Sequence, residues 1–245
     1  MKAGIISFIF KSPSTPVLWS SDFTQQLSSF HQLAGMSHCL AVSDEVIACV
    51  YDQNCVKFFN VSTKQIVHKM PFDERDFTVH ACSINYHVLT VHAVTVEEML
   101  TGRTDDTAFL WKDGRKIDKW TNLFYETALG QIISAKFSPK GNTLALASLD
   151  TYKLFIFDVV STSMLAQIPF SGKFGGLKFF DDKNLICGFH QTIYFINVEP
   201  GEILACLDSG IWPFPISICR KRSIVCAGLH RSRNFQLLEV ILPRM

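Results

Sequence analysis

The residue types that most often carry chemistry are present, but their spacing predicts no catalytic or metal site. His80, His87 and His92 lie in one stretch at separations of 7 and 5 residues, whereas zinc ligands come as close pairs on a helix or hairpin. The motifs GxxxxGK[ST], GxGxxG, GxSxG and HExxH are all missing from the sequence. Phosphate-cradling, dinucleotide, hydrolase and zincin sites therefore have no support. We expect no catalytic residue, no metal and no cofactor.

Two further segments resemble ligand-binding motifs but are interpreted as turns. Gly172–Gly176 (GKFGG) resembles a glycine-rich loop, yet it precedes a predicted strand rather than a helix. A turn between two structural units explains it better. Arg220–Arg222 is the densest basic cluster and could grip phosphate or an acidic partner. A solvated turn between two strands is the preferred interpretation.

The cysteines indicate a reducing compartment. The chain has eight, with no CxxC pair, and several lie inside apolar runs, where a reduced thiol behaves as a small hydrophobe. We expect a cytoplasmic protein, with the nucleus as an alternative. The apolar segment Ala3–Phe10 resembles a signal peptide, but Lys11 ends it and no cleavage site of small residues follows. Secretion with paired cysteines is the competing interpretation.

Charge and composition exclude several kinds of partner. Lys and Arg number 23 against 22 Asp and Glu, which gives a net charge of +1, and 48% of the residues are hydrophobic. Such a chain can bury a large core but has no net field that would attract nucleic acid or anionic lipid. No apolar stretch approaches the ~20 residues that span a bilayer. We expect protein partners, no nucleic acid and no membrane span. The sequence does not indicate an oligomeric state.

Short apolar runs bounded by turn residues predict an all-β chain. One element recurs: an apolar run, an aromatic or aliphatic residue, and then a polar residue. The equivalent positions lie 40, 52, 46, 39 and 42 residues apart, and four of these spacings are near the period of a four-stranded propeller blade, about 40 to 45 residues. The long interval contains the polar segment Thr95–Asp106, interpreted as a loop insertion. The equivalent residues are Trp19, Phe59, Trp111, Phe157, Ile196 and Leu238.

The clearest unit runs from Ile132 to Phe170. Its turn Ser138–Asn142 has a proline that fixes φ and a glycine that allows a positive φ. The sequence Phe137–Asp150, followed by Leu154–Asp158, resembles a WD-repeat unit, with its FSPDG-like turn, LASGS-like strand, Asp turn and strand ending in Trp-Asp. Departures are the missing Gly-His dipeptide and Phe157 in place of Trp. The buried Asp-His-Ser-Trp network of that family cannot be assembled in any one unit.

The resemblance implies a single β-propeller domain over residues 1–245. We expect about six four-stranded blades with incomplete blades at both ends; a truncated ring from a longer protein is the alternative, and the preferred one. The segment 22–33 is ambiguous, because Phe23, Leu27 and Phe30 have helical spacing and a strand over 25–30 competes. Trp120 is expected to pack in the core on an outer strand.

By the same resemblance, the binding face is lined by loops between units and by loops between the second and third strands. The exposed aromatics Trp212 and Phe214 could anchor a partner there, although packing between blades is the favoured interpretation for them. The full set of expected protein-binding residues is Trp212, Phe214, His190, Tyr152, Arg231 and Arg233.

A rigid scaffold with variable loops suits a non-catalytic protein-interaction module. The resemblance further implies the sensor or regulatory end of a multidomain signalling protein. The alternative is a secreted or surface propeller that acts as an enzyme or a ligand-binding module.

Overall fold

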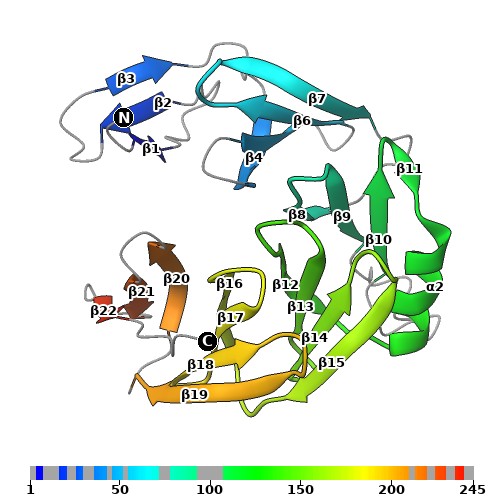
Figure 1. Cartoon of the computed structure of the whole chain (residues 1–245), viewed down its shortest axis with the longest axis vertical. Helices are drawn as coiled ribbons and strands as arrows, with labels where there is room; N and C mark the ends of the chain where they lie inside the picture. Colours follow the sequence, from blue (N-terminus) through cyan, green and yellow to red (C-terminus); the bar gives the residue numbers. More distant parts are fainter. Residues whose placement is uncertain are drawn as a thin grey trace. The chain divides into compact units, whose positions relative to one another are not determined.

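In the residues that it describes, the computed structural model forms strands and the helix α2 (Figure 1). The described residues are 4–7, 17–20, 26–29, 36–42, 46–51, 55–71, 78–92, 107–209, 213–219, 224–229 and 235–239. They fall into two compact units, Met1–Phe77 and Thr78–Met245, which are treated separately below. Within these ranges no helix is long and apolar enough to cross a membrane.

The first unit contains two antiparallel sheets. One has the order β1-β2-β3, formed by Gly4–Ser7, Val17–Ser20 and Gln26–Ser29. The other has the order β4-β5-β6-β7. Its strands are Met36–Ala41, Val46–Tyr51, Cys55–Asn60 and Gln65–Pro71.

The second unit contains four sheets, each a chain of neighbouring strands. The sheet β8–β11 comprises Thr78–Cys82, His87–His92, Thr107–Lys112 and Arg115–Lys116. The sheet β12–β15 comprises Ile132–Phe137, Thr143–Ser148, Lys153–Asp158 and Ser163–Pro169. The sheet β16–β19 comprises Phe174–Phe179, Asn184–Phe189, Thr192–Asn197 and Glu202–Asp208. The last, β20–β22, comprises Pro213–Cys219, Ile224–Leu229 and Phe235–Glu239.

Six sheets are therefore described, and the first and last have three strands each. This confirms the predicted all-β class of about six blades with incomplete terminal blades, and the fold is that of a β-propeller. The turn predicted over Gly172–Gly176 is only partly correct: Gly172 and Lys173 lie between the strands, but Phe174–Gly176 belong to β16. In the ambiguous segment 22–33, residues 26–29 form the strand β3, and the flanking residues lie outside the described ranges.

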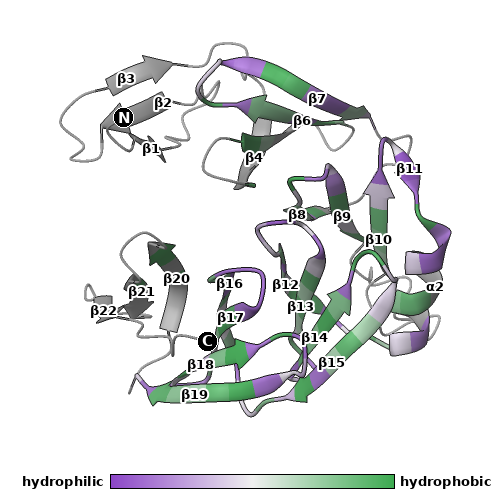
Figure 2. Cartoon of the chain, viewed as in Figure 1, coloured by the Kyte–Doolittle hydropathy of each residue, from purple (hydrophilic) through white to green (hydrophobic). Residues whose placement is uncertain are grey.

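Burial follows the position of a strand in its blade. All six residues of β13 are buried, because a second strand is covered on both faces by neighbouring blades, whereas all seven of β19 are exposed. Figure 2 shows β19 as hydrophobic along most of its length with hydrophilic ends.

The pairs β6·β7, β14·β15 and β18·β19 carry a register shift at the same place in the third strand. Such a bulge bends the outer strand and increases its twist.

The core of the second unit lies between adjacent blades. Alternate residues of β14 face opposite neighbours: Phe155 and Phe157 pack with the side of β8–β11, and Leu154 and Ile156 pack with the side of β16–β19. This alternation is the period of two expected for a strand. The sheet β12–β15 is thus packed against its two neighbours by one apolar layer on each of its faces.

Trp120 corrects one expectation. It is buried, as predicted, but it lies in the helix α2, Asp118–Thr127, and not on an outer strand. The fourth strand of this blade, β11, has only two residues. Trp120 and Phe124 lie one helical turn apart, and their rings pack edge-on against Phe157 with centroids 5.7 and 5.5 Å away. The helix therefore supplies the apolar cover that an outer strand supplies in the other blades.

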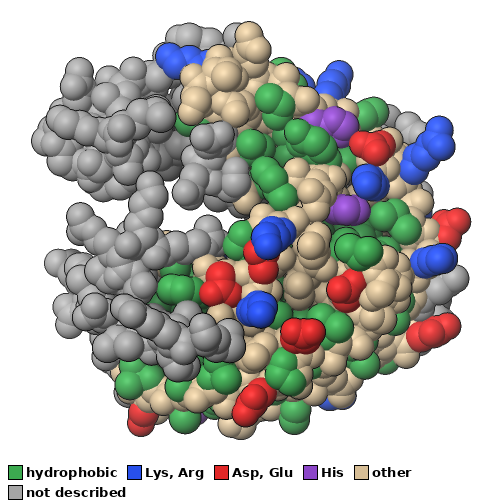
Figure 3. All heavy atoms as spheres, in the orientation of Figure 1, with side chains coloured by type: hydrophobic (Ala, Val, Ile, Leu, Met, Phe, Trp, Pro, Cys, Tyr) green, Lys and Arg blue, Asp and Glu red, His purple; other side chains and the backbone are tan. Residues whose placement is uncertain are grey.

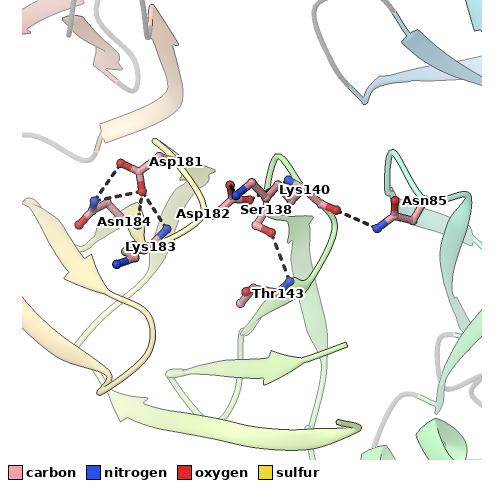
Figure 4. A network of polar contacts seen from close by, with 8 residues as sticks. All are labelled: Asn85, Ser138, Lys140, Thr143, Asp181, Asp182, Lys183 and Asn184. Atoms are coloured by element: carbon pink, nitrogen blue, oxygen red, sulfur yellow. Dashed lines mark hydrogen bonds and ion pairs between the residues drawn. The ribbon is translucent and has the colours of Figure 1, made fainter. Parts of the chain in front are cut away.

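The turns between first and second strands are linked from blade to blade (Figure 4). The Asn85 side-chain amide donates to the Lys140 carbonyl at 2.8 Å, and the Lys140 backbone N–H donates to Asp182 at 2.7 Å. Asp182 also pairs with the Lys140 ammonium at 3.8 Å. Three consecutive blades are thus joined by polar contacts at one end of their sheets. We call this end, which also carries the turns between third and fourth strands, the turn face.

Candidate protein-binding face

The other end of the sheets carries two of the predicted binding residues. Tyr152 lies in the turn between β13 and β14, and His190 lies in the turn between β17 and β18. Both turns join a second to a third strand, so they occupy the same end of adjacent blades. The segment 170–173, which connects β15 to β16, runs between them. We call these three segments, Leu149–Tyr152, Phe170–Lys173 and His190–Gln191, the loop face.

Backbone hydrogen bonds join the segments of the loop face. The Phe170 N–H donates to the Tyr152 carbonyl at 2.8 Å, and the His190 N–H donates to the Lys173 carbonyl at 2.7 Å. The next connection repeats the arrangement, because the N–H of Ser209 donates to the Gln191 carbonyl at 2.7 Å. Each connection is therefore fixed to the turns that flank it, and the surface has a defined backbone.

Tyr152 and His190 share an unusual backbone conformation. Their φ angles are 50° and 52°, in the left-handed region that non-glycine residues seldom adopt. Both side chains are exposed, Tyr152 to 42%. Gly172 lies so close to His190 that a Cβ atom on it would come within 2.9 Å of the His190 Cβ. The fold thus holds both turns in a strained conformation that presents a ring to solvent.

Phe170 anchors the connection. Its ring stacks on Phe189 with centroids 4.2 Å apart and an interplanar angle of 7°, and it meets Tyr194 edge-on at 4.8 Å. The residue was not among those expected at this face. Its signal in the sequence is its place directly before the turn residues Ser171 and Gly172.

Asp150 closes the first turn of the loop face. Its carboxylate accepts from the Ser148 hydroxyl at 2.9 Å, from the Gln131 N–H at 3.0 Å and from the Thr151 N–H at 2.9 Å. Burial acts to raise the pKa of Asp150, but these hydrogen bonds outweigh burial and lower it. The ionised carboxylate therefore ties the turn to the preceding connection and has a structural role.

Two polar contacts of the described residues, one made by Trp111 and one by Asp150, lie in different blades. The buried indole N–H of Trp111 on β10 donates to the Thr90 hydroxyl on β9 at 2.8 Å. The Asp turn at Asp150 belongs to the next blade.

The remaining predicted binding residues are not placed on the loop face. Trp212, Arg231 and Arg233 lie outside the described residues, as does the insertion Thr95–Asp106. Phe214 belongs to β20, Pro213–Cys219, rather than to a connection between blades. Tyr152 and His190 are thus the two expected residues that the structure brings to one surface. In the described part of the chain, no group of three or more His, Cys, Asp or Glu residues is arranged to hold a metal ion.

Comparisons with known proteins agree on the fold alone. No family model matches the chain, and no curated protein sequence matches it. Among solved structures, it is similar to a chain of the Mitotic Checkpoint Complex, with a TM-score of 0.60 and 10% identity over 96% of this chain and 69% of that one. It is also similar to a chain of Kuenenia stuttgartiensis Hydrazine Synthase, with a TM-score of 0.64 and 10% identity over 97% of this chain and 80% of that one. Both are β-propeller folds.

Proposed function

We propose that this chain is a non-catalytic protein-interaction module of the WD-repeat type, acting in the cytoplasm or nucleus through its loop face. The observation that carries the proposal is the backbone hydrogen bonding of that face, which fixes Tyr152 and His190 on adjacent blades with their rings exposed. Preorganised aromatic side chains on a rigid scaffold are typical anchors of protein contacts, because little conformational entropy is lost on binding.

The charge distribution also supports a protein partner over nucleic acid. The net charge is +1, and on the face seen in Figure 3 acidic and basic side chains are interspersed. Phosphate-backbone binding needs several basic residues in one field and weakens steeply with salt. Similarity to a chain of the Mitotic Checkpoint Complex is compatible with a module inside a larger regulatory assembly.

The test compares protein partners captured by the native chain and by a loop-face variant. Tyr152→Asn together with His190→Asn removes both rings, and Asn tolerates the left-handed backbone. Gln167→Ala, at an exposed position of the outer strand β15, is the matched control. We expect crosslinked partners to be lost with the double variant and kept with the control, with equal thermal stability. Equal partner sets for all three proteins would show that the loop face is not the interface.

The second candidate, an enzyme or ligand-binding propeller in a secretory setting, has one observation in its favour. A fold neighbour is a chain of Hydrazine Synthase, so the fold serves enzymes as well as interaction modules. Alkylation of the denatured protein with and without reduction separates the candidates. All eight cysteines alkylated without reduction fit the interaction module, whereas alkylation that requires reduction fits the secreted protein.

A further inference from the structure

A cavity opens on the turn face between the blades β8–β11 and β12–β15. Its volume is about 640 Å³, within the range of ligand sites in proteins. One wall comes from the turns that follow β8 and β10 and from the strand ends beside them. It includes Asn85, His87 at the start of β9, Lys112 at the end of β10, and Asp113. The other wall includes Val159 and Val160, from the turn that follows β14. We call this space the turn cavity; it lies at the opposite end of the sheets from the loop face.

The polar wall is held in place before any ligand binds. His87 donates its backbone N–H to the Ser83 hydroxyl oxygen at 3.0 Å, and its Nδ1 lies 3.3 Å from the same oxygen. The imidazole stacks on Phe137 with centroids 6.4 Å apart. When the hydroxyl donates to Nδ1, the ring proton resides on Nε2, which becomes a donor. Asn85 is fixed by its hydrogen bond to Lys140.

This wall carries one cation, Lys112, and one anion, Asp113. Burial, and then the neighbouring Lys112, lower the pKa of His87, against the opposing effect of Asp113. The neutral ring therefore keeps one N–H that can donate to a ligand. Asp113 already makes an interaction of its own, and Lys116 lies over the Phe109 ring at 4.3 Å. Among the described residues no ion pair of Lys112 is found, and its ammonium is the cation of this wall.

The opposite wall is apolar. Val159 is buried, but Val160 is exposed to 77%, the largest exposure among the exposed large hydrophobic side chains of the described chain. Covering such a side chain removes apolar surface from water, worth about 25 cal/mol per Å². The turn cavity thus places an ammonium and an imidazole N–H opposite an aliphatic surface.

We propose that the turn cavity binds an acidic segment of a partner protein, with a Glu or Asp carboxylate against Lys112 and His87 and a neighbouring aliphatic side chain against Val160. The volume accommodates a few residues, not a folded domain. The turn cavity is independent of the loop face. The proposal for the turn cavity can therefore be correct or wrong whatever the loop face binds.

The first experiment selects ligands on the full chain. Three pools of random octapeptides are compared, with Glu, Gln or Lys fixed at the centre. We expect enrichment from the Glu pool, with aliphatic residues beside the fixed position. No enrichment of the Glu pool over the Gln pool would overturn the proposal. Displacement of a selected peptide by inorganic phosphate at equal concentration would also overturn it, since the site would then be a phosphate site.

The second experiment locates the binding with matched variants, by fluorescence anisotropy of a labelled selected peptide. Lys112→Gln is expected to weaken binding about threefold to tenfold, whereas Asp113→Asn, one residue away, is expected to strengthen it about twofold, because opposite charges are removed. Val160→Ala is expected to weaken binding about threefold. Tyr152→Asn, on the loop face, serves as the control and should change nothing. Equal affinity for the Lys112 and Asp113 variants would refute the proposal.

Discussion

Lys136 is expected to destabilise the fold at neutral pH. It lies on β12 between Ala135 and Phe137, which pack with the side of β8–β11, so its own side chain points toward the other neighbour, β16. There its ammonium loses water and meets Lys178. Burial first, and Lys178 second, lower the pKa of Lys136 from 10.5 to about 8, while Cys82 partly opposes the change.

The magnitude follows from the pKa. A lowering from 10.5 to about 8 corresponds to about 3 kcal/mol of differential interaction against the charged form. Since the folded-state pKa is below the unfolded-state value, this cost is fully present below pH 8 and disappears as the pH rises toward 10.5. Lys136→Met keeps a flexible side chain of similar shape without the charge. We expect the substitution to raise the free energy of unfolding by about 1–3 kcal/mol at pH 7.

The assay is urea unfolding followed by tryptophan fluorescence at pH 7, 8.5 and 10. The difference between the two proteins is measured, so that titrations common to both cancel. The gain from Lys136→Met should be largest at pH 7 and shrink toward pH 10. Lys183→Met, at an exposed turn position, is the control and should change the free energy by less than about 0.5 kcal/mol. A gain that does not depend on pH, or a loss of stability, would refute the reasoning.

Two further substitutions test individual contacts of the fold. Thr90→Val removes the acceptor of the buried Trp111 N–H and should cost about 1–3 kcal/mol. Trp111→Phe in the same chain should restore part of that cost, and strict additivity in urea unfolding would contradict the assignment. Gly201→Ala places a Cβ against Ala166 at a φ of 67° and should lower the melting temperature by about 3 °C or more. An unchanged melting temperature would show that the turn relaxes without strain.

The strands and their period were predictable because each blade repeats the same physical pattern. A second strand such as β13, buried on all six residues, can only be a continuous apolar run, and its turns require Pro139 and Gly141. Since blades pack on their neighbours alone, the pattern recurs near the blade period, and Phe157 and Ile196 could be aligned without any structure. Local composition and burial agree in these elements.

The helix α2 could not be predicted in the same way. Trp120 and Phe124 have helical spacing, but the segment occupies the chain position of an outer strand, and the preceding strand β11 is cut to two residues. The helix is favoured over a strand by the packing of Trp120 and Phe124 against Phe157, a residue more than 30 positions away. Contacts between blades, such as that of Lys140 with Asp182, likewise join turns 42 residues apart and leave no signature in either turn.

The positions of Tyr152 and His190 in turns could be predicted from the sequence, but the conformation of those turns and the place of Phe170 could not. A turn between a second and a third strand can be recognised from its flanking strands, which is how Tyr152 and His190 were found. The conformation of the turn depends on the connection that hydrogen-bonds to it, and for His190 on the missing side chain of Gly172. Phe170 was overlooked because its role comes from stacking on Phe189 and Tyr194, not from its own segment.

The two ends of the sheets are constrained in different ways, and this bears on how the protein can change. On the loop face, backbone N–H groups donate to backbone carbonyls, so the scaffold does not depend on the side chains of Tyr152 or His190. On the turn face, the links use the side chains of Asn85 and Asp182. Substitution of Tyr152 or His190 should therefore leave the fold intact, whereas substitution of Asn85 or Asp182 should loosen the contact between blades. Recognition can diversify most freely where side chains carry no structural hydrogen bond, and by that criterion the loop face is the better place for a partner-specific contact.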